Sequence, residues 1–140
     1  MRFMIIVRAS KDSEAGKLPS PELLAAMGKY NEELVKAGVM QAGEGLQASS
    51  NGARVKFSGA HRTVTQGPFP LDSVIAGLWI FNVKSKEEAI EWVKRAPNPM
   101  PDGGEIEIRQ LFAPEDFGEN LTPELKEQED RLRAQTASRQ

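Results

Sequence analysis

Val74-Ile75-Ala76-Gly77-Leu78-Trp79-Ile80-Phe81-Asn82-Val83 is the most apolar stretch of the chain. Its length and its content of β-branched and aromatic residues are typical of a buried strand. The run Phe3–Val7 is similarly apolar, and we expect it to form a strand that is covered on both faces. Two such strands predict a sheet at the centre of the fold.

Two helices are expected on either side of this stretch. Ser20 is placed to cap a helix that begins at Pro21, follows an apolar stripe at helical spacing and ends at Gly38. Ser85 and Glu88 have the spacing of a capping box that opens a second helix, which Pro97 ends. Residues 9–18, before the first helix, are expected to form a polar loop.

The remaining strands follow from alternation of polar and apolar residues. Residues 53–57 and 62–65 predict a hairpin that turns at Gly59, and residues 105–111 alternate strictly. Residues 39–42 are expected to form a short strand that ends at the glycines Gly43 and Gly45. The order predicts an α+β fold: a ferredoxin-like antiparallel sheet with two helices on one face and an inserted hairpin.

The second face of the predicted sheet has no helix to cover it. Two helices suffice for one face only, and an apolar sheet face left in water would be larger than monomers usually tolerate. A homodimer in which sheet packs on sheet is therefore expected.

The composition changes near residue 115. Residues 1–114 form the predicted domain, whereas residues 115–140 contain seven acidic and four basic side chains and predict a charged helical extension that begins after Thr122. Two alternatives stay open for this extension: it packs on the partner subunit, or it frays.

Composition also limits the partners. The formal charge of −2 arises from 18 basic and 20 acidic residues in mixed order, which argues against nucleic-acid binding. The chain contains no cysteine, and the apolar run between Arg2 and Arg8 is too short for a signal peptide or a membrane span. We expect a protein of the cytoplasm that does not bind membranes.

The candidate ligand-binding residues lie at strand ends and in one rigid turn. The turn Thr65-Gln66-Gly67-Pro68-Phe69-Pro70 can present two side chains at a cleft edge, and Gly77 would leave room for a ligand beside Trp79 if their face lines the cleft. For each candidate the alternative is ordinary packing or solvent exposure. The predicted ligand-binding set is Arg8, Glu44, Gln66, Phe69, Asp72 and Trp79.

No metal site or cofactor is predicted. The single histidine, His61, is expected at the hairpin tip, and one histidine without cysteine gives no transition-metal cluster. Gly43, Gly45 and Ala48 match a dinucleotide-binding pattern, but that pattern needs a helix to begin there, and residues 49–52 do not begin one. Catalytic residues are not identified by the sequence.

Several segments together resemble the YCII-related proteins of the DGPF type, over residues 1 to about 117. They include Ala42-Gly43-Glu44-Gly45-Leu46 and Thr63-Val64-Thr65-Gln66-Gly67-Pro68-Phe69. The resemblance implies a ferredoxin-like subunit that forms a dimeric α+β barrel with a cleft between the sheets. Gln66 stands where the family's name motif has aspartate, and the first helix lacks the histidine associated with a proposed catalytic pair.

Three functions are consistent with this sequence. The first is small-molecule binding in the cleft, with a cryptic enzyme activity if a buried carboxylate serves as acid or base. The second is a regulatory or accessory role beside an extracytoplasmic-function sigma factor, which the resemblance implies and which would use the charged extension. The third is a dimeric scaffold without chemistry.

Overall fold

The computed structural model describes residues 1–100 and 103–139, which form two compact units, Met1–Gln110 and Leu111–Gln140. The predicted boundary after residue 114 lies four residues beyond the end of the first unit. Each unit is described by itself below.

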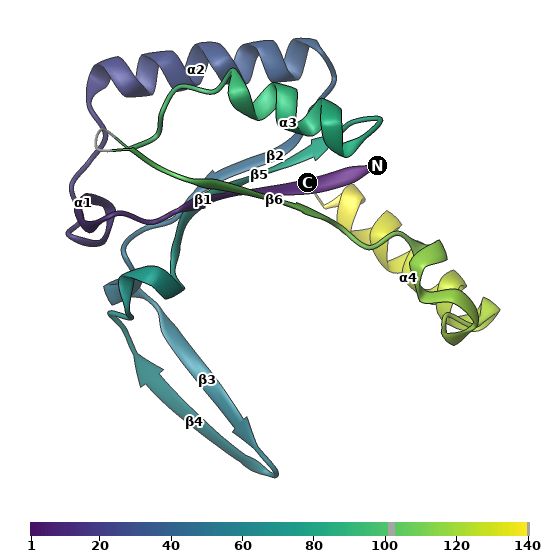
Figure 1. The fold of residues 1–140 in the computed structure, drawn as a ribbon. Coiled ribbons are helices and arrows are strands. Elements are labelled where there is room, and N and C mark those ends of the chain that lie inside the picture. The colour runs from purple at the N-terminus through teal and green to yellow at the C-terminus, as the bar shows by residue number, and fades with distance from the viewer. Residues whose placement is uncertain (101–102, 140) are drawn as a thin grey trace. The chain divides into compact units, whose positions relative to one another are not determined.

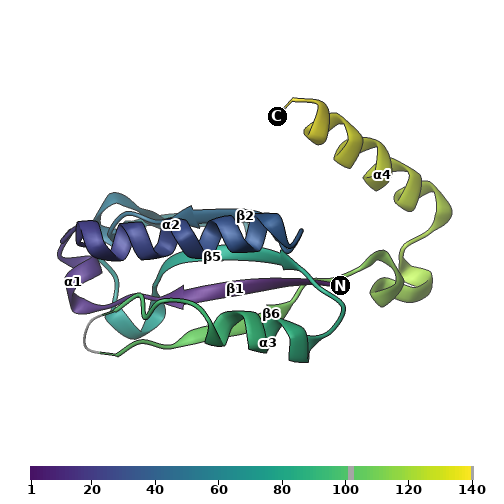
Figure 2. The same cartoon turned by 90° about the horizontal axis from the view of Figure 1, so that it is seen from above.

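The first unit contains a four-stranded antiparallel sheet. Its strands are β1 (Arg2–Arg8), β2 (Met40–Gly45), β5 (Ile75–Asn82) and β6 (Ile106–Gln110), in the order β2-β5-β1-β6. The helices α2 (Pro21–Lys36) and α3 (Lys86–Lys94) lie over one face of this sheet (Figures 1 and 2). The predicted ferredoxin-like α+β fold is confirmed.

The inserted hairpin is also present. It consists of β3 (Ala53–Ser58) and β4 (His61–Gln66), which pair only with each other. Short helical turns flank it at Ser49–Asn51 (η1) and Leu71–Ser73 (η2). The hairpin turns at Gly59, whose φ of +57° favours glycine.

Local sequence signals fix the helix ends. The Ser20 hydroxyl accepts a hydrogen bond from Leu23 N at 3.1 Å, and Gly38 follows α2 with a φ of +71°. At α3 the Ser85 hydroxyl caps Glu88 N at 3.1 Å, as expected. The Glu88 carboxylate accepts from Lys84 N instead of Ser85 N, so the reciprocal half of the capping box is displaced by one residue.

The prediction of a polar loop over residues 9–18 was incomplete. One turn of helix, α1 (Lys11–Glu14), lies in this segment. The side chains of Ser10 and Ser13 each accept a hydrogen bond from the backbone N–H of the other, and this exchange holds the turn.

The strand β2 is longer than predicted, because it continues through both glycines to Gly45. A Cβ at Gly43 would lie 2.9 Å from Cδ1 of Trp79. Gly43 is therefore a position of close packing within the strand and not the end of the strand.

The core lies between the sheet and the two helices. In register, Phe3 pairs with Phe81 and Ile5 with Trp79, and these four side chains face the helices and are buried. Leu34 of α2 is fully buried against them. Alternate residues on the same strands point to the other face. Among the described residues of the first unit, β1 is fully buried on one face only, and its expected cover on both faces is not found.

Tyr30 joins the two helices to the sheet. Its ring meets Trp79 edge to face at 5.8 Å between centroids, and its hydroxyl donates to the Trp92 carbonyl at 2.6 Å. Trp79 Nε1 in turn donates to Asn31 Oδ1 at 2.9 Å. Burial raises the pKa of Tyr30 to about 12, so the hydroxyl keeps its proton at neutral pH.

The second unit consists of the 3-10 turns of η3 (Pro114–Asn120) and the helix α4 (Pro123–Ser138). The Thr122 hydroxyl caps α4 by accepting from Leu125 N at 3.3 Å, as the sequence predicted. No described residue of α4 is buried. Across the described chain, every helix is too short or too polar to cross a membrane.

The two faces of α2 provide a test of this packing. We expect Leu34→Ala to lower the free energy of unfolding by about 2–5 kcal/mol, because it opens a cavity in the core. Leu24 is 57% exposed on the same helix, and Leu24→Ala should change stability by less than about 0.5 kcal/mol. Urea unfolding followed by circular dichroism measures both, and equal losses would contradict the helix orientation.

Candidate functional site

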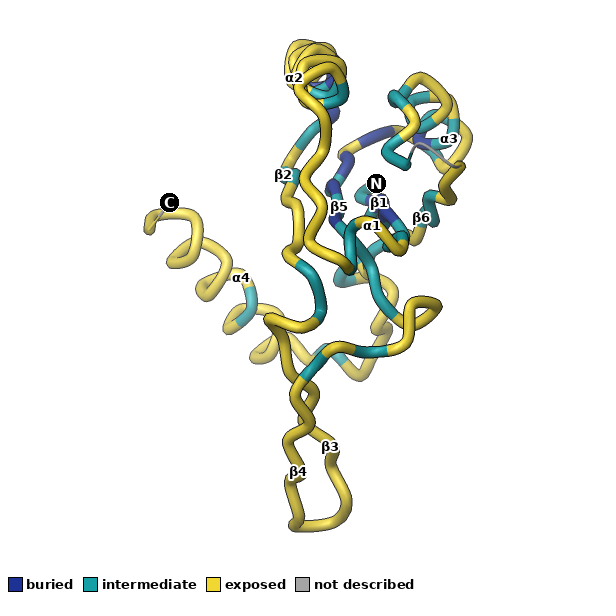
Figure 3. Tube along the Cα trace, turned by 90° about the vertical axis from the view of Figure 1, so that its left-hand side faces the viewer, coloured by how far each residue is buried: buried dark blue, intermediate teal, exposed yellow. Residues whose placement is uncertain are grey.

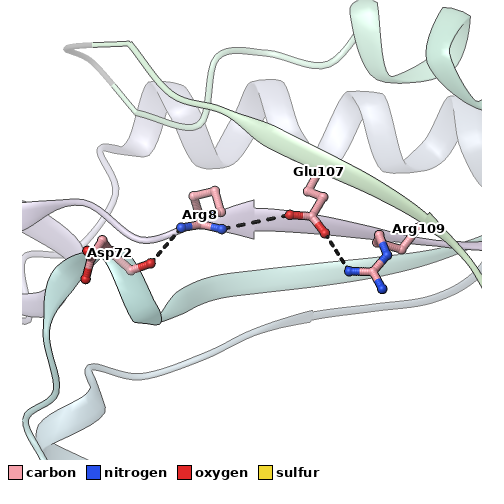
Figure 4. Close-up of polar contacts among 4 residues, drawn as sticks. All are labelled: Arg8, Asp72, Glu107 and Arg109. Carbon is pink, nitrogen blue, oxygen red and sulfur yellow. Dashed lines mark hydrogen bonds and ion pairs between the residues drawn. The ribbon is translucent and has the colours of Figure 1, made fainter.

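A row of charged side chains centres on Arg8 at the end of β1 (Figure 4). Arg8 Nη2 donates to the backbone carbonyl of Asp72 at 2.7 Å, and Arg8 Nη1 lies 3.9 Å from Glu107 Oε1. Arg109 Nη1 donates to Glu107 Oε2 at 3.1 Å. We call Arg8, Glu107 and Arg109 the charged cluster.

The charged cluster lies on the uncovered face of the sheet. Ile6 pairs with Glu107 on one side and with Leu78 on the other, and both neighbours point away from the helices with it. Met4 pairs with Arg109 and with Ile80 in the same way. The centre of this face is apolar, and charged groups lie along its β6 side.

The same register places Glu44 at the opposite side of the uncovered face. Glu44 of β2 pairs with Leu78, so the row across the sheet runs from Glu44 through Leu78 and Ile6 to Glu107. Three strand spacings separate its ends, or about 14 Å. Arg8 and Glu44 therefore share a face of the sheet but do not converge within one chain.

An open depression adjoins Arg8. It has a volume of about 480 Å³ and is lined by Arg8–Ser10 on one side and by Met100 and 103–105 on the other. Its walls are the end of β1 and the segment that leads into β6, so Arg8 belongs both to this depression and to the uncovered face.

The turn that contains Gln66 and Phe69 is held from several sides. The Phe69 N–H donates to the Ser49 hydroxyl at 3.0 Å, and the Arg54 guanidinium lies 3.9 Å from the centroid of the Phe69 ring. Gln66 is exposed at the end of β4 and pairs with Ala53. Both residues therefore lie at the base of the hairpin, and Asp72 follows them along the chain.

Sequence reasoning missed an acidic residue of α1 that supports this turn through Ser49. Glu14 accepts hydrogen bonds from Ser49, at Oε1 from the backbone N–H over 2.9 Å and at Oε2 from the hydroxyl. These hydrogen bonds hold the pKa of Glu14 below its ordinary value, and the bond from the hydroxyl contributes more than the bond from the N–H. The capping spacing of Ser10 and Ser13 could have revealed α1, but no local pattern connects residue 14 with residue 49.

Close packing at Gly67 completes this arrangement. A Cβ on Gly67 would lie 1.8 Å from the carbonyl oxygen of Ser49, which leaves no space for a side chain. The Gly67 N–H also donates to the Gly52 carbonyl at 3.0 Å. Glu14, Ser49, Gly67 and Phe69 together form what we call the turn anchor.

Trp79 lies apart from the other candidates. It is buried on the helix-covered face, with Gly77 on the same face. A Cβ at Gly77 would lie 2.9 Å from the Glu44 carbonyl oxygen, so Gly77 allows close backbone packing beside β2. Trp79 therefore does not share a surface with Arg8 or with the Glu44 side chain.

Metal ligands do not gather in the described part of the chain. No group of three or more histidine, aspartate or glutamate side chains is placed to hold an ion among residues 1–100 and 103–139. His61 is exposed at the hairpin tip, where it pairs with Ser58.

Comparison with protein families matches residues 1–114 to the model of the YCII-related domain. The chain belongs to the YCII-related family. The match covers the whole sheet, both core helices and the inserted hairpin, and it confirms the family that the sequence resembled. A comparison with curated proteins found no match. The narrower DGPF assignment of this YCII-related protein stays a prediction.

The Glu14 contact makes a specific prediction about acid stability. A lowered pKa in the folded state stabilises the folded chain above the ordinary glutamate pKa of about 4.3, and this contribution is lost as the pH falls through the lower folded-state value. We expect Glu14→Gln to lower the melting temperature at pH 7 and to lower it much less at pH 3. Glu32→Gln, on the exposed side of α2, is the matched control. An unchanged difference between wild type and Glu14→Gln at the two pH values would contradict this role.

Proposed function

We propose that this protein is a homodimer that binds a small anionic molecule in a cleft between its two sheets. The observation that carries the proposal is Arg8, a guanidinium oriented by the Asp72 carbonyl at the border between the uncovered apolar face and an open depression. The family membership supports the fold that this arrangement needs.

The uncovered face supports the dimer. Its centre is formed by Met4, Ile6, Leu78 and Ile80, and its sides carry Glu44 and the charged cluster. An apolar centre with a polar rim is the usual composition of a protein interface. A second copy related by a twofold axis would cover the apolar centre and place its own rim charges beside those of the first.

The charged cluster defines the chemistry of the ligand. Two guanidinium groups and one carboxylate leave a net charge of about +1 at the cluster, which favours an anion. Guanidinium recognises carboxylate and phosphate groups through paired hydrogen bonds. Because Ile6 and Met4 lie beside the cluster, a carboxylate with an apolar body fits this surface better than a small inorganic ion.

Ligand binding alone explains the arrangement of these charged groups, and no catalytic role is needed. Glu107 already contacts Arg8 and Arg109, and Glu44 lies about 14 Å away across the sheet. If the partner subunit covers either carboxylate, it could serve as an acid or a base, and the protein would then be a cryptic enzyme. A scaffold without a ligand is the alternative if neither face nor depression binds an anion.

The arginines of β1 offer a matched test of ligand binding. Arg2 and Arg8 lie at opposite ends of the same strand, on the same face. We expect benzoate, the probe, to bind the wild-type protein saturably, and Arg8→Gln to weaken that binding at least about tenfold, because a hydrogen bond to a charged group contributes about 1.5–3 kcal/mol. Arg2→Gln should leave it unchanged. Amide chemical shifts followed by NMR measure all three proteins.

Two results would contradict the anion site. One is wild-type affinity in Arg8→Gln. The other is the absence of saturable binding of both benzoate and inorganic phosphate by the wild-type chain.

A second candidate function is binding of a transcription-regulatory protein, such as an extracytoplasmic-function sigma factor, through the C-terminal unit. The observation that favours it is a set of apolar side chains that this unit leaves exposed. Phe112 and Phe117 stack at 4.9 Å between centroids and are 68% and 43% exposed, and Leu125 and Leu132 of α4 are about half exposed. Exposed apolar groups of this kind are typical of a protein-binding segment.

Removal of residues 119–140 separates the roles of the extension. If the extension is a partner-binding segment, the shortened chain should stay folded and keep the wild-type oligomeric state. Circular dichroism and light scattering after gel filtration measure the two properties. Dissociation of the shortened chain would instead make the extension a structural part of the dimer.

A further inference from the structure

The β3–β4 hairpin exposes an apolar stripe on one face. Val55 pairs with Val64, and these two side chains share a face with Phe57 because residues alternate along each strand. Val55 is 49% exposed, Val64 59% and Phe57 70%. Figure 3 shows the whole hairpin as exposed.

Contacts within the first unit hold only the base of this hairpin. Arg54 donates to the carbonyl and the hydroxyl of Ser73 at 3.2 and 3.0 Å, and its guanidinium stacks on Phe69. Beyond Arg54 the described contacts are local, such as the Arg62 guanidinium over the Phe57 ring at 4.5 Å. A two-stranded hairpin is marginally stable in water by itself, so the outer part needs a surface to pack against.

The direction of the hairpin indicates where that surface lies. Figures 1 and 3 both show the hairpin projecting from the sheet on the side opposite to α2 and α3. This is the side of the uncovered sheet face. A second copy that covers this face would therefore lie alongside the hairpin.

Interface size also favours a second copy of this chain on the hairpin. Stable interfaces bury about 800 Å² of accessible surface on each partner. The hairpin would add the exposed side chains of Val55, Phe57 and Val64 to the surface that the sheet face buries.

Charge also favours a second copy of this chain. The hairpin carries Arg54, Lys56 and Arg62 and no acidic residue, so its formal charge is +3. Residues 1–52 and 67–110, the rest of the first unit, contain 11 basic and 13 acidic residues, so their formal charge is −2. A basic arm is attracted to a body of opposite net charge, whereas two hairpins placed against each other would repel.

We propose that the β3–β4 hairpin is a clasp that packs the face of Val55, Phe57 and Val64 on the body of a second copy. The inference rests on the proposed homodimer and adds to it a segment that enlarges the interface. The turn anchor and the Arg54 contacts hold the base of the clasp, and its outer half becomes buried on association.

Substitutions on the two hairpin faces test the clasp. Val64→Asp places a charge on the apolar stripe, whereas Thr63→Asp places the same charge one residue away on the opposite face. Sedimentation velocity over a range of concentrations should show a dimer dissociation constant raised at least tenfold for Val64→Asp and changed less than threefold for Thr63→Asp. Equal constants for Val64→Asp and wild type would overturn the clasp.

A thiol placed in the hairpin gives a readout that does not depend on disrupting it. The chain has no cysteine, so Val55→Cys and Lys56→Cys each carry a single thiol, on opposite faces. The rate of reaction of Val55→Cys with Ellman's reagent should fall at least fivefold as the protein concentration rises through the dimer dissociation constant. The rate for Lys56→Cys should stay constant. Equal protection of both thiols, or of neither, would overturn the clasp.

A sheet-face variant separates this inference from the proposed function. Met4→Glu places a carboxylate opposite Arg109 on the uncovered face. If Met4→Glu dissociates the dimer while Val64→Asp does not, the clasp is wrong and the homodimer stands. If Val64→Asp alone dissociates it, the clasp stands and the sheet-to-sheet arrangement is wrong. A wild-type chain that is monomeric at every concentration overturns both.

Discussion

The side chains of β1 and β5 alternate between two faces, and helices cover only one of them. Cross-strand pairing of Phe3 with Phe81 and of Ile5 with Trp79 fills the space beneath α2 and α3. The same alternation forces Ile6 and its neighbours onto the other face, which neither α2 nor α3 covers (Figure 1). A one-residue change of register would exchange the faces, so the core and the uncovered surface are fixed by one and the same pairing.

The turn before β5 connects the hairpin to the charged cluster. Gly67 packs on the Ser49 carbonyl, the Phe69 N–H is bound by the Ser49 hydroxyl, and Ser49 is held by Glu14. Asp72 follows within a few residues, and its carbonyl orients Arg8. The turn therefore contributes shape and hydrogen bonds, while the charge comes from Arg8. Gln66 is neutral and adds no charge to this turn.

Periodicity and caps were sufficient to predict the elements of this fold, because signals such as Ser20 with Pro21, or the alternation around Gly59, act within a few residues. Signals of this kind could not predict the face of the sheet on which the Trp79 side chain lies. It depends on strand register and on which face the helices cover, and neither is encoded locally. The contact of Glu14 with Ser49 joins residues that are 35 positions apart in the sequence. The local sequence predicts that each of them lies in a polar loop. The candidate site was therefore predictable at Arg8, which ends an obvious strand, and not at the residues that hold the turn.

The geometry around Arg8 bears on the energetic cost of binding an anion. Its contact with Asp72 is short, at 2.7 Å, whereas its contact with Glu107 is long, at 3.9 Å, with both side chains 37% exposed. A partly exposed pair of this kind contributes only about 0–1 kcal/mol, so an anion that replaces Glu107 loses little. The short bond to the carbonyl would persist and keep the guanidinium oriented, which reduces the entropy lost on binding. Cover from a second copy would lower the local dielectric and strengthen the new contact. Because a backbone group orients Arg8 and Glu107 does not, the guanidinium is ordered within the single chain.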